Sequence, residues 1–371
     1  MRKIMQTALL TGVLLLPRLC AAQGQPGSTL IGPSLGLMFD SASAEIRPIL
    51  GIPGAATLGA PLDAGFAVGQ AVVAPRGDFA LVVAKDDSSL AVVSASGGVL
   101  RNFAPAMGEA PDLISFSPGG SSAALYYRAS RRLVVLTGLR SQTPQAVEAD
   151  ASSLPAAPSL IAVKEDAAAL LLAVPLGEAT GLYLLPNRPQ AARSMSPKET
   201  AAAALRSELS AVSSPAHAVA QKVGSFQSVS ALRFAAAGSD AFVADSAANA
   251  VYLVENASGA AHIAALGAAR DGLFQPVAIE TLDAKRVLVA NAGAKTLTIL
   301  YRDGSPVTSI QCGCSPTVLH QLSGNSVYRL TEPSQEPLWL LDAGGDELRI
   351  VAVPPDRSQS APAAAAEGAQ R

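Results

Sequence analysis

The side chains of this sequence best suited to acid–base or metal chemistry are three histidines, His217, His262 and His320. An imidazole changes its charge near neutral pH and is the commonest metal ligand in proteins. No two of the three have the spacing of ligands on one helix, and each falls in a different sequence context. We expect each to lie on the surface or on an edge strand, and we predict no catalytic, cofactor-binding or metal-binding residue.

Other short motifs favour turns and core packing. The sequence has no Gly-x-Ser-x-Gly turn to hold a nucleophile and no phosphate-binding loop, since Gly119–Gly120 indicates a hairpin turn. A Ser/His/Asp triad built from distant residues stays open. Arg76–Asp78 spells the integrin-binding tripeptide, but its place between two apolar runs favours a turn. Trp339 lies in an apolar run and is expected in the core, and Asn256–Ser258 is a glycosylation sequon only in a eukaryotic secretory pathway.

Cys312 and Cys314 flank a single glycine, and this arrangement allows two interpretations. Two residues apart on a strand, Cα atoms lie near the upper limit of the separation that a disulfide bridges. A tight disulfide is compatible with an oxidising compartment. We prefer the other interpretation, two small residues in a turn between repeats. A metal site would need further ligands nearby, and the sequence shows none.

The composition indicates a folded protein that does not bind nucleic acid. Hydrophobic residues make up 49% of the 371 residues and charged residues 15%, the opposite of a disordered chain. The net charge of -2 provides no basic field for a nucleic acid. Aromatic residues are only 4%, and small aliphatic residues, Gly and Pro replace them, as in proteins of many short strands joined by turns.

Residues 1–22 have the features of a signal peptide. Arg2 and Lys3 give the positive start, and Ile4–Leu16 is mostly apolar but too short to cross a bilayer as a helix. Cleavage near Ala22 would release a periplasmic or extracellular protein, which we expect to be monomeric and without a transmembrane segment. Cys20 offers a lipoprotein alternative, but the residues before it lack the small side chains that a lipoprotein peptidase requires.

An internal repeat dominates the rest of the chain. Each copy has two apolar runs separated by a short turn, and successive copies start about 40 to 50 residues apart, with one gap of about 70. Runs of about four to six apolar residues are too short for core helices and suit strands buried on both faces. The six pairs of runs are Phe79–Ala84 with Leu90–Val93, Ala123–Tyr127 with Leu133–Leu136, Ala169–Ala173 with Leu182–Leu185, Ala241–Ala244 with Val251–Val254, Arg286–Ala290 with Leu297–Leu300, and Ser326–Leu330 with Leu338–Leu341.

This spacing predicts an all-β fold, a single β-propeller of four-stranded blades over residues 23–355. A segment before each pair would form the innermost strand of its blade. A more polar segment after it, such as Val99–Phe103 or Pro306–Ile310, would form the outer edge strand. The innermost segments are Gln70–Pro75, Leu113–Pro118, Ser159–Val163, Ser230–Phe234, Pro276–Ile279 and Pro316–Leu319.

The number of blades is six or seven. Six copies are complete, and the last of them runs through Leu348–Val353. Near the N-terminus, Leu35–Phe39 and Ile46–Leu50 have the pattern of a third and a fourth strand without the first two. A ring must be closed, because open blade edges expose unpaired backbone groups. We favour seven blades, with this pair as a thin seventh blade.

Two repeats resemble the YVTN-type propeller repeat. Val287–Asn291 followed by Lys295–Ile299 matches its hydrophobic strand ending in Ala-Asn, its polar turn and its Thr-containing strand, and Ala241–Val254 is similar with Ala-Asp. The other copies match only in hydrophobic outline. The chain is thus similar to secreted bacterial repeat propellers of the YVTN and NHL types and to lactonase-type propellers, which share a fold and differ in function.

The long gap, residues 187–225, predicts an inserted loop with one helix. Ser196–Glu199 combines a capping serine, a proline at the first helical position and a glutamate three residues on. Thr200–Val212 then has high helix propensity, and Ser213–Pro215 ends it. The insertion is either a lid or partner-docking element over the central channel, or a tolerated loop of no specific role. The tail, residues 356–371, is expected to be disordered.

A propeller scaffold without a concentrated polar cluster predicts a non-enzymatic interaction or scaffold module that binds protein partners outside the cytoplasm. The alternative is a lactonase-like or other hydrolase, which requires a histidine and several acidic residues at one channel mouth. A structural part of an envelope assembly is a third hypothesis. We interpret as solvated turn residues the acidic side chains that end or join the apolar runs, Asp86, Asp87, Glu165, Asp166, Asp245 and Asp342.

Overall fold

The computed structural model of the chain describes residues 32–101, 103, 108–141, 143–187, 219–323, 326–333, 337–345 and 347–354. Its strands lie in one compact unit that begins at Pro33. The predicted signal peptide, the predicted helix at 200–212 and the tail at 356–371 fall outside the described residues. Within the described part of the chain, the one helical element is the short 3-10 helix η1 (Ala269–Asp271), and no helix is long and apolar enough to cross a bilayer.

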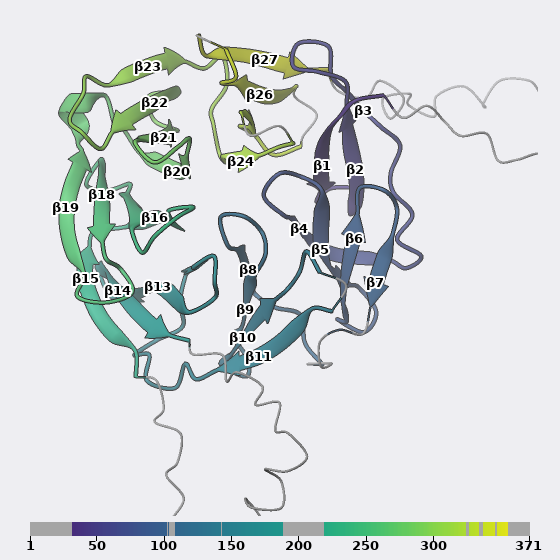
Figure 1. Cartoon of the computed structure of the whole chain (residues 1–371), viewed down its shortest axis with the longest axis horizontal. Helices are drawn as coiled ribbons and strands as arrows, with labels where there is room; N and C mark the ends of the chain where they lie inside the picture. The colour runs from purple at the N-terminus through teal and green to yellow at the C-terminus, as the bar shows by residue number, and fades with distance from the viewer. Residues whose placement is uncertain are drawn as a thin grey trace, which may run out of the picture. The chain divides into compact units, whose positions relative to one another are not determined.

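The described strands form seven antiparallel sheets that follow one another around a ring (Figure 1). The chain is therefore a seven-bladed β-propeller, which confirms the predicted fold and the preferred number of blades. Blades two to four contain β4 (Val68–Val73), β5 (Phe79–Ala84), β6 (Leu90–Ser94) and β7 (Val99–Arg101); β8 (Leu113–Phe116), β9 (Ala123–Tyr127), β10 (Arg132–Thr137) and β11 (Gln145–Ala149); and β12 (Leu160–Val163), β13 (Ala169–Leu176), β14 (Ala179–Pro186) and β15 (Gln221–Phe226). Blades five to seven contain β16 (Val229–Phe234), β17 (Ala241–Asp245), β18 (Ala250–Glu255) and β19 (His262–Gly267); β20 (Pro276–Thr281), β21 (Arg286–Asn291), β22 (Thr296–Tyr301) and β23 (Thr308–Gln311); and β24 (His320–Gln321), β25 (Val327–Arg329), β26 (Leu338–Asp342) and β27 (Arg349–Val353).

The second and third strands of each blade build the core. Every residue of β5, β9 and β17 is buried. Between the third and fourth blades, Leu133 and Val135 of one sheet pack with Leu170 and Leu172 of the next. A blade has a neighbour on each side, so both faces of its central strands are covered. This is why their sequences are continuous apolar runs rather than alternating ones.

The first blade has three strands, β1 (Ser34–Asp40), β2 (Glu45–Leu50) and β3 (Thr57–Leu58). The sequence predicted β1 and β2, but as a third and a fourth strand. It missed β3, because two residues are too few to show a pattern, and with β3 outside them β1 and β2 are the second and third strands of the blade. β1 is not an innermost strand, because the innermost strand of the seventh blade reaches the second blade directly. There the Arg76 N–H donates to the Gln321 carbonyl at 3.0 Å.

Two turns take the place of the missing innermost strand and close the ring. The Ser323 N–H, just after β24, donates to the Leu35 carbonyl at 2.7 Å. The Leu37 N–H donates to the Gly77 carbonyl, in the turn between β4 and β5, at 2.8 Å. At this contact a Cβ atom on Gly36 would lie 2.9 Å from the Gly77 Cα. The turns thus pair backbone groups of β1 that an open edge would leave without partners.

Two predicted boundaries were wrong. The innermost strand of the last blade is β24, just after the predicted Pro316–Leu319. The N–H groups of Thr317 and Val318 both donate to the Leu330 carbonyl, at 2.9 and 3.2 Å, so this segment does not continue the regular ladder. The predicted insertion, 187–225, also included β15, which is the polar fourth strand of its blade. The insertion therefore ends before Gln221.

Two equivalent ion pairs join neighbouring blades. In each, an aspartate just before a second strand pairs with an arginine just after the third strand of the following blade. The partners are 62 residues apart in both pairs, and the arginine also lies over a phenylalanine ring of the second strand. The pairs are Asp78–Arg140, with Arg140 over Phe79 at 5.2 Å, and Asp240–Arg302, with Arg302 over Phe242 at 6.0 Å.

Replacing Asp240 by asparagine is expected to lower the free energy of unfolding by about 1 kcal/mol. The substitution removes the carboxylate that lies 2.5 Å from Arg302, at a site where both side chains are only about a quarter exposed. Urea denaturation followed by the fluorescence of Trp339, the single tryptophan, measures the loss. Asp86→Asn, at an exposed position, is the matched control and should change stability by less than about 0.5 kcal/mol. Equal losses in the two variants would contradict a stabilising role for the pair.

Candidate functional site

The structure places the described histidines in very different surroundings. His262 lies on the outer strand β19 with 73% of its side chain exposed, 3.3 Å from a carboxylate oxygen of Glu255, as predicted for an edge-strand residue. His320 lies on the innermost strand β24, and its Nε2 atom is buried. His320 thus lies on an edge strand of its sheet, as one of the two predicted alternatives, although this strand is the innermost one and was predicted to end just before it. His217 falls outside the described residues.

A cluster of polar side chains surrounds His320 on the strands nearest the ring axis. Arg233 Nε lies 2.8 Å from Glu280 Oε1, and Arg329 Nη1 lies 2.6 Å from Glu332 Oε2. Each arginine thus has one carboxylate partner. We call this group the axial cluster; it consists of Arg233 of β16, Glu280 of β20, His320 of β24, and Tyr328 and Arg329 of β25.

The axial cluster keeps the imidazole of His320 neutral. Burial and the positive charges of Arg329 and Arg233 lower the pKa of His320 to about 3, although its hydrogen bond with the Ala74 backbone acts in the other direction. Within the described residues, Nε2 has no hydrogen-bond partner. An efficient general base has a pKa near the working pH, and a group with a pKa of about 3 takes up a proton poorly at neutral pH. His320 is therefore not suited to general acid–base catalysis.

Burial also shifts the pKa of a carboxyl group and of a phenol in the cluster. Burial raises the pKa of Glu280, although the Arg233 charge opposes this. Burial also raises the pKa of Tyr328, and the negative charge of Glu280 acts in the same direction. The cluster brings one imidazole and one carboxylate to the axis, not the several acidic residues that a hydrolase of the predicted kind requires. Among the described residues, no three His, Cys, Asp or Glu side chains gather in a way that could hold a metal ion.

Two polar residues that end second strands are buried and hold the adjoining loops. Asp245, at the end of β17, accepts the N–H groups of Gln227 and Ser228 at 2.7 and 3.0 Å. Asn291, at the same position of β21, donates from Nδ2 to Thr298 Oγ1 at 3.1 Å. Neither side chain reaches solvent, so the prediction of a solvated turn for Asp245 was wrong. These residues follow alanine in the two repeats that resemble the YVTN type. Here their side chains hydrogen-bond to neighbouring segments of their own blades.

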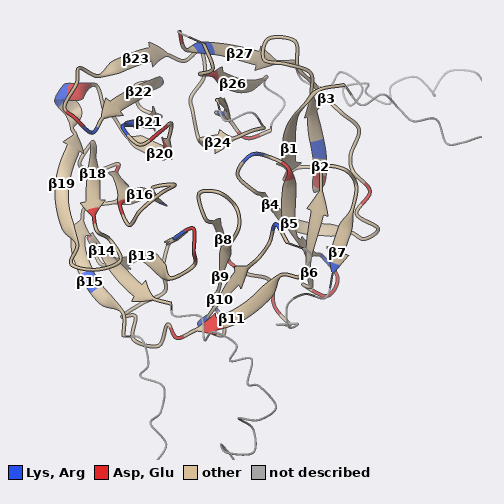
Figure 2. Cartoon of the chain, viewed as in Figure 1, with Lys and Arg blue, Asp and Glu red and all other residues tan. Residues whose placement is uncertain are grey.

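Of the remaining acidic side chains at strand ends, Asp166 is exposed in a turn, whereas Asp342 is the half-buried last residue of β26. Figure 2 shows that charged residues are few and occur mainly in turns and loops. Asp86 and Asp87 are exposed, as predicted. Glu165 is half-buried and joins two blades, because it accepts the Gly119 N–H and the Ser121 hydroxyl, both at 2.6 Å. None of these acidic side chains belongs to the axial cluster.

Cys312 and Cys314 form a disulfide in the connection between β23 and β24. The position between blades was predicted correctly, but the preferred interpretation of two unlinked residues was wrong. Their Cα atoms are 5.0 Å apart, well within the range that a disulfide bridges, because the chain here turns and is not extended. Both cysteines are buried, and Gly313 between them packs on Trp339, whose ring would lie 3.1 Å from a Cβ at that position.

Removing this disulfide is expected to lower the free energy of unfolding by about 1.5 kcal/mol. The estimate is small because the bridge closes a loop of only a few residues and so restricts the unfolded chain little. Urea denaturation with and without a reductant measures the effect. A double variant, Cys312→Ala with Cys314→Ala, should match the reduced protein and should not respond to the reductant. A reduced protein as stable as the oxidised one would contradict the prediction.

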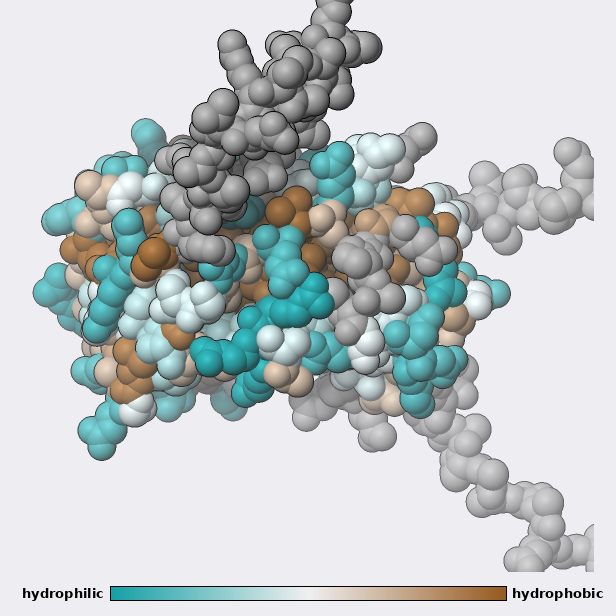
Figure 3. Space-filling model, turned by 90° about the horizontal axis from the view of Figure 1, so that it is seen from below, coloured by the Kyte–Doolittle hydropathy of each residue, from teal (hydrophilic) through white to brown (hydrophobic). Residues whose placement is uncertain are grey.

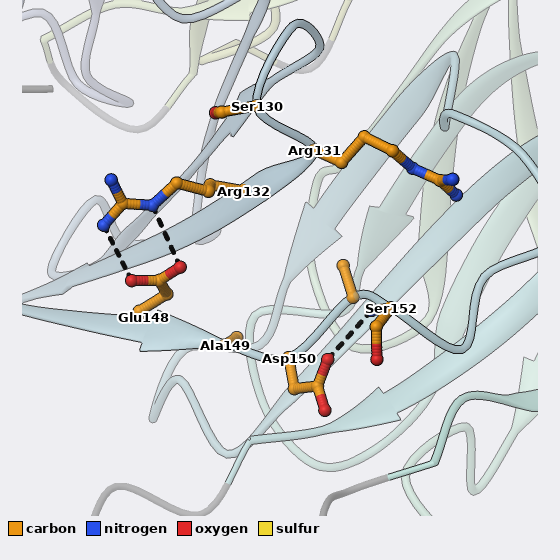
Figure 4. Close-up of a pocket in the computed structure, with 8 residues that line it drawn as sticks. Ser130, Arg131, Arg132, Glu148, Ala149, Asp150 and Ser152 are labelled. Carbon is orange, nitrogen blue, oxygen red and sulfur yellow. Dashed lines mark hydrogen bonds and ion pairs between the residues drawn. The ribbon is translucent and has the colours of Figure 1, made fainter. Parts of the chain in front are cut away.

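An open pocket of about 640 Å³ lies beside the outer strands of the third blade (Figure 4). The turn between β9 and β10 forms one side, and the end of β11 with the loop that follows forms the other. Across it, Arg132 and Glu148 make a bidentate ion pair, with Nε–Oε1 and Nη2–Oε2 distances of 2.9 and 2.7 Å. The blade pocket, as we call it, is lined by Ser130, Arg131, Arg132, Glu148, Ala149, Asp150, Ala151 and Ser152.

The two arginines of the blade pocket differ in their partners. The hydrogen bond with Glu148 raises the pKa of Arg132 and lowers the pKa of Glu148, so this pair stays charged and mutually neutralised. Arg131 donates from Nη2 to the Leu154 carbonyl, a long bond of 3.3 Å. Among the described residues, no carboxylate lies within ion-pair distance of its guanidinium group. Arg131 is therefore an exposed cation on the pocket wall without a balancing charge.

The sequence interpretation missed the blade pocket. Its two sides are separated by a whole strand, and they meet because β10 pairs with β11 in a register that sets Leu133 opposite Ala149. The charged residues near the start of β10 and the end of β11 were a signal from which the pocket could have been predicted. The loop beyond the pocket also contacts the start of β15, where the Ala220 N–H donates to Ser153 Oγ at 2.9 Å.

The described surface offers no broad apolar area on the side of the ring that Figure 3 shows, where hydrophilic residues divide the hydrophobic ones into separate patches. The exposed large hydrophobic residues belong to different blades. Val99 and Leu100 lie on β7, Val147 lies on β11, and Leu176 ends β13. Scattered apolar residues are normal on a surface, so they do not by themselves mark a docking area. The polar blade pocket is the more specific feature.

No protein-family description and no curated protein matches the sequence. Among solved structures, a functionally unknown protein from Desulfotomaculum acetoxidans is 12% identical, over 87% of this chain and 100% of that chain, with a TM-score of 0.51. Hydrazine synthase from Kuenenia stuttgartiensis is 11% identical over 90% and 99% of the two chains, with a TM-score of 0.48. Virginiamycin B lyase from Staphylococcus aureus is 11% identical over 86% and 95%, with a TM-score of 0.42. Identities this low show the fold alone: the chain is a seven-bladed β-propeller.

Proposed function

We propose that the chain is an exported interaction module that binds a protein partner and does not catalyse a reaction. The observation that carries the proposal is the blade pocket, where exposed charged side chains surround a cavity of about 640 Å³. The two walls of the pocket are joined by the pairing of β10 with β11. A site whose walls are held by a rigid scaffold can bind a partner without first being ordered, which lowers the entropy cost of binding.

The hydrolase alternative would have to use the axial cluster. Such an enzyme needs a histidine that exchanges protons near neutral pH. The pKa of His320 is about 3, and Glu280 is held by Arg233. A buried neutral imidazole beside two arginine–glutamate ion pairs supports a structural role at the axis. An esterase or lactonase activity that is lost in His320→Asn and kept in Arg131→Asn would overturn this part of the proposal.

Export is part of the same proposal. It is supported by the signal-peptide features of residues 1–22 and by the disulfide, because structural disulfides persist in oxidising compartments. Mass spectrometry of the protein from cell fractions tests it. We expect a mature N-terminus at Gln23 and no free thiol in the periplasmic or extracellular fraction. A cytoplasmic protein that keeps residues 1–22 and two free thiols would contradict export.

Kinship with secreted bacterial propellers of the YVTN and NHL types also belongs to the proposal. Its support is that Asp245 and Asn291, the residues that carry the resemblance, are buried and bind the loops of their blades. We expect related chains to have a buried polar side chain at the equivalent position, because it binds the loop of its blade. Secreted propellers of these types in which the equivalent side chain is solvent-exposed would contradict the kinship.

Affinity capture from an envelope extract tests the proposed function. The baits are the full mature protein and a variant that lacks residues 188–218. This deletion stops before Gln221, because β15 belongs to its blade. We expect the wild-type bait to retain a partner that excess untagged protein displaces. If no retained protein is displaced in this way from either bait, the chain is not the proposed interaction module.

A further inference from the structure

Arg131 occupies a turn position that the fold repeats in other blades. The residue before or near the start of the third strand has a positive φ at Ser88, Gly177, Asn249 and Lys295, as it does at Arg131, where φ is 54°. Gly and Asn adopt this left-handed conformation most readily, and other side chains cost about 1 kcal/mol or more. The fold itself therefore does not require an arginine in this turn.

Two features of the blade pocket define the chemistry of a ligand. The Arg131 guanidinium has five N–H donors, and only Nη2 has an acceptor among the described residues, the Leu154 carbonyl. A carboxylate fits the remaining donors as a two-pronged acceptor. On the other wall, the Asp150 carboxylate accepts the Ser152 N–H at 2.9 Å, and the exposed Ser152 hydroxyl lines the pocket as an acceptor for an N–H group. A ligand that offers a carboxylate together with N–H donors matches both walls.

The charge balance of the pocket limits how anionic this ligand is. Glu148 already neutralises Arg132, and Asp150 adds a second carboxylate to the lining of the pocket. A polyanion such as a nucleic acid would meet two carboxylates for two guanidinium groups, which gives no net attraction. A single carboxylate next to peptide N–H groups avoids this repulsion. The volume of about 640 Å³ lies within the range of pockets that enclose ligands of this size.

We infer that the blade pocket binds an acidic peptide segment of the partner, with one carboxylate on the Arg131 guanidinium and a backbone N–H group on the Ser152 hydroxyl. The inference rests on the proposed function and adds the chemistry of the partner. The carboxylate comes from an acidic side chain or from a peptide C-terminus, and both sources present the same group. Arg131 is the residue that sets the specificity, and Arg132 with Glu148 forms the fixed floor beside it.

Fluorescence anisotropy with three labelled peptides tests this inference on the full mature protein. The first is a short glutamate-containing peptide with an amidated C-terminus, the second its glutamine analogue with a free C-terminal carboxylate, and the third the glutamine analogue with an amide. The variants are Arg131→Asn and its matched control Lys295→Asn. Both remove one positive charge from the same turn position of a blade, and asparagine suits the positive φ, so both variants should fold at least as stably as wild type.

We expect the first or the second peptide to bind wild type and Lys295→Asn alike, and to bind Arg131→Asn about ten- to a hundredfold more weakly, as for the loss of a charge-assisted hydrogen bond. The peptide that binds identifies the source of the carboxylate. The inference is overturned if no carboxylate peptide binds at millimolar concentration, if the uncharged peptide binds equally well, or if both variants lose affinity equally. A partner captured from the extract in any of these cases would leave the proposed function standing.

Discussion

Replacing Gly36 by alanine is expected to destabilise the propeller by about 3 kcal/mol. Gly36 has a φ of +126°, and a Cβ there would lie 2.9 Å from the Gly77 Cα and 3.2 Å from the Gly77 carbonyl oxygen. Both contacts are with backbone, which cannot rotate away. The cost therefore adds backbone strain of about 1 to 3 kcal/mol to an overpacking cost of similar size. Gly77→Ala should behave in the same way, since its Cβ would lie 2.8 Å from the Gly36 Cα.

The control for this experiment is Gly304→Ala. Gly304 also has a positive φ, +77°, but no atom lies within 4 Å of its ideal Cβ. Its substitution measures the strain alone, about 1 to 2 kcal/mol. Urea denaturation gives the three values, and amide hydrogen exchange at Leu37 and Ser323 shows whether the ring contacts open. A loss at Gly36 no larger than that at Gly304 would mean that the two turns do not close the ring as described.

Stability is also expected to fall by about 4 kcal/mol as the pH is lowered from 6.5 to 3, through His320 alone. The pKa of His320 is about 3 in the folded protein, against an ordinary value of 6.5 in the unfolded chain. Between these two values the unfolded chain binds a proton that the folded protein does not. Lowering the pH therefore favours unfolding across this window, and the contribution of His320 is complete above pH 6.5.

Other groups titrate in the same range, so the test is a difference between two proteins. The raised pKa of Glu280 acts in the opposite direction, because its folded form takes up a proton at higher pH than the unfolded chain. Carboxylates with a lowered pKa, such as Glu148, add a further loss at acidic pH. His320→Asn keeps a donor for the Ala74 carbonyl and removes the titration. The stability of wild type minus that of the variant should fall by up to about 1.4 kcal/mol per pH unit below 6.5. Parallel curves for the two proteins would show that the imidazole is not buried as described.

The propeller fold was predictable because the burial of its central strands requires a pattern that is visible within short segments of the sequence. Strands buried on both faces need continuous apolar runs, and Phe79–Ala84 and Ala123–Tyr127 are such runs at blade spacing. Ring closure was not predictable in the same way. It depends on the backbone of the turn at Gly77 meeting β1, and on a β24 too short to carry a pattern. Contacts of this kind follow from the closed ring and not from any one segment.

The sites were harder to predict than the fold for a related reason. His320 was expected at the surface or on an edge strand, and the burial of its Nε2 atom becomes evident only when the last innermost strand is placed. The disulfide depended on a turn that brings two Cα atoms to 5.0 Å, which the spacing alone left open. The blade pocket depended on the register of β10 against β11. In each case the sequence shows the residues themselves. Their surroundings depend on how the strands pair and turn, which the sequence alone does not show.

Site-specific photo-cross-linking tests the central claim, that a protein partner binds at the blade pocket, most directly. A photoreactive amino acid replaces Ser130 beside Arg131, and in a second protein it replaces Ala294, at the equivalent turn of the sixth blade. Both proteins are produced in cells and irradiated there. We predict one discrete adduct with a second protein at position 130, lost when Arg131 is also replaced by asparagine, and no such adduct at position 294. The absence of an adduct at position 130, or the same adducts at both positions, would contradict the claim.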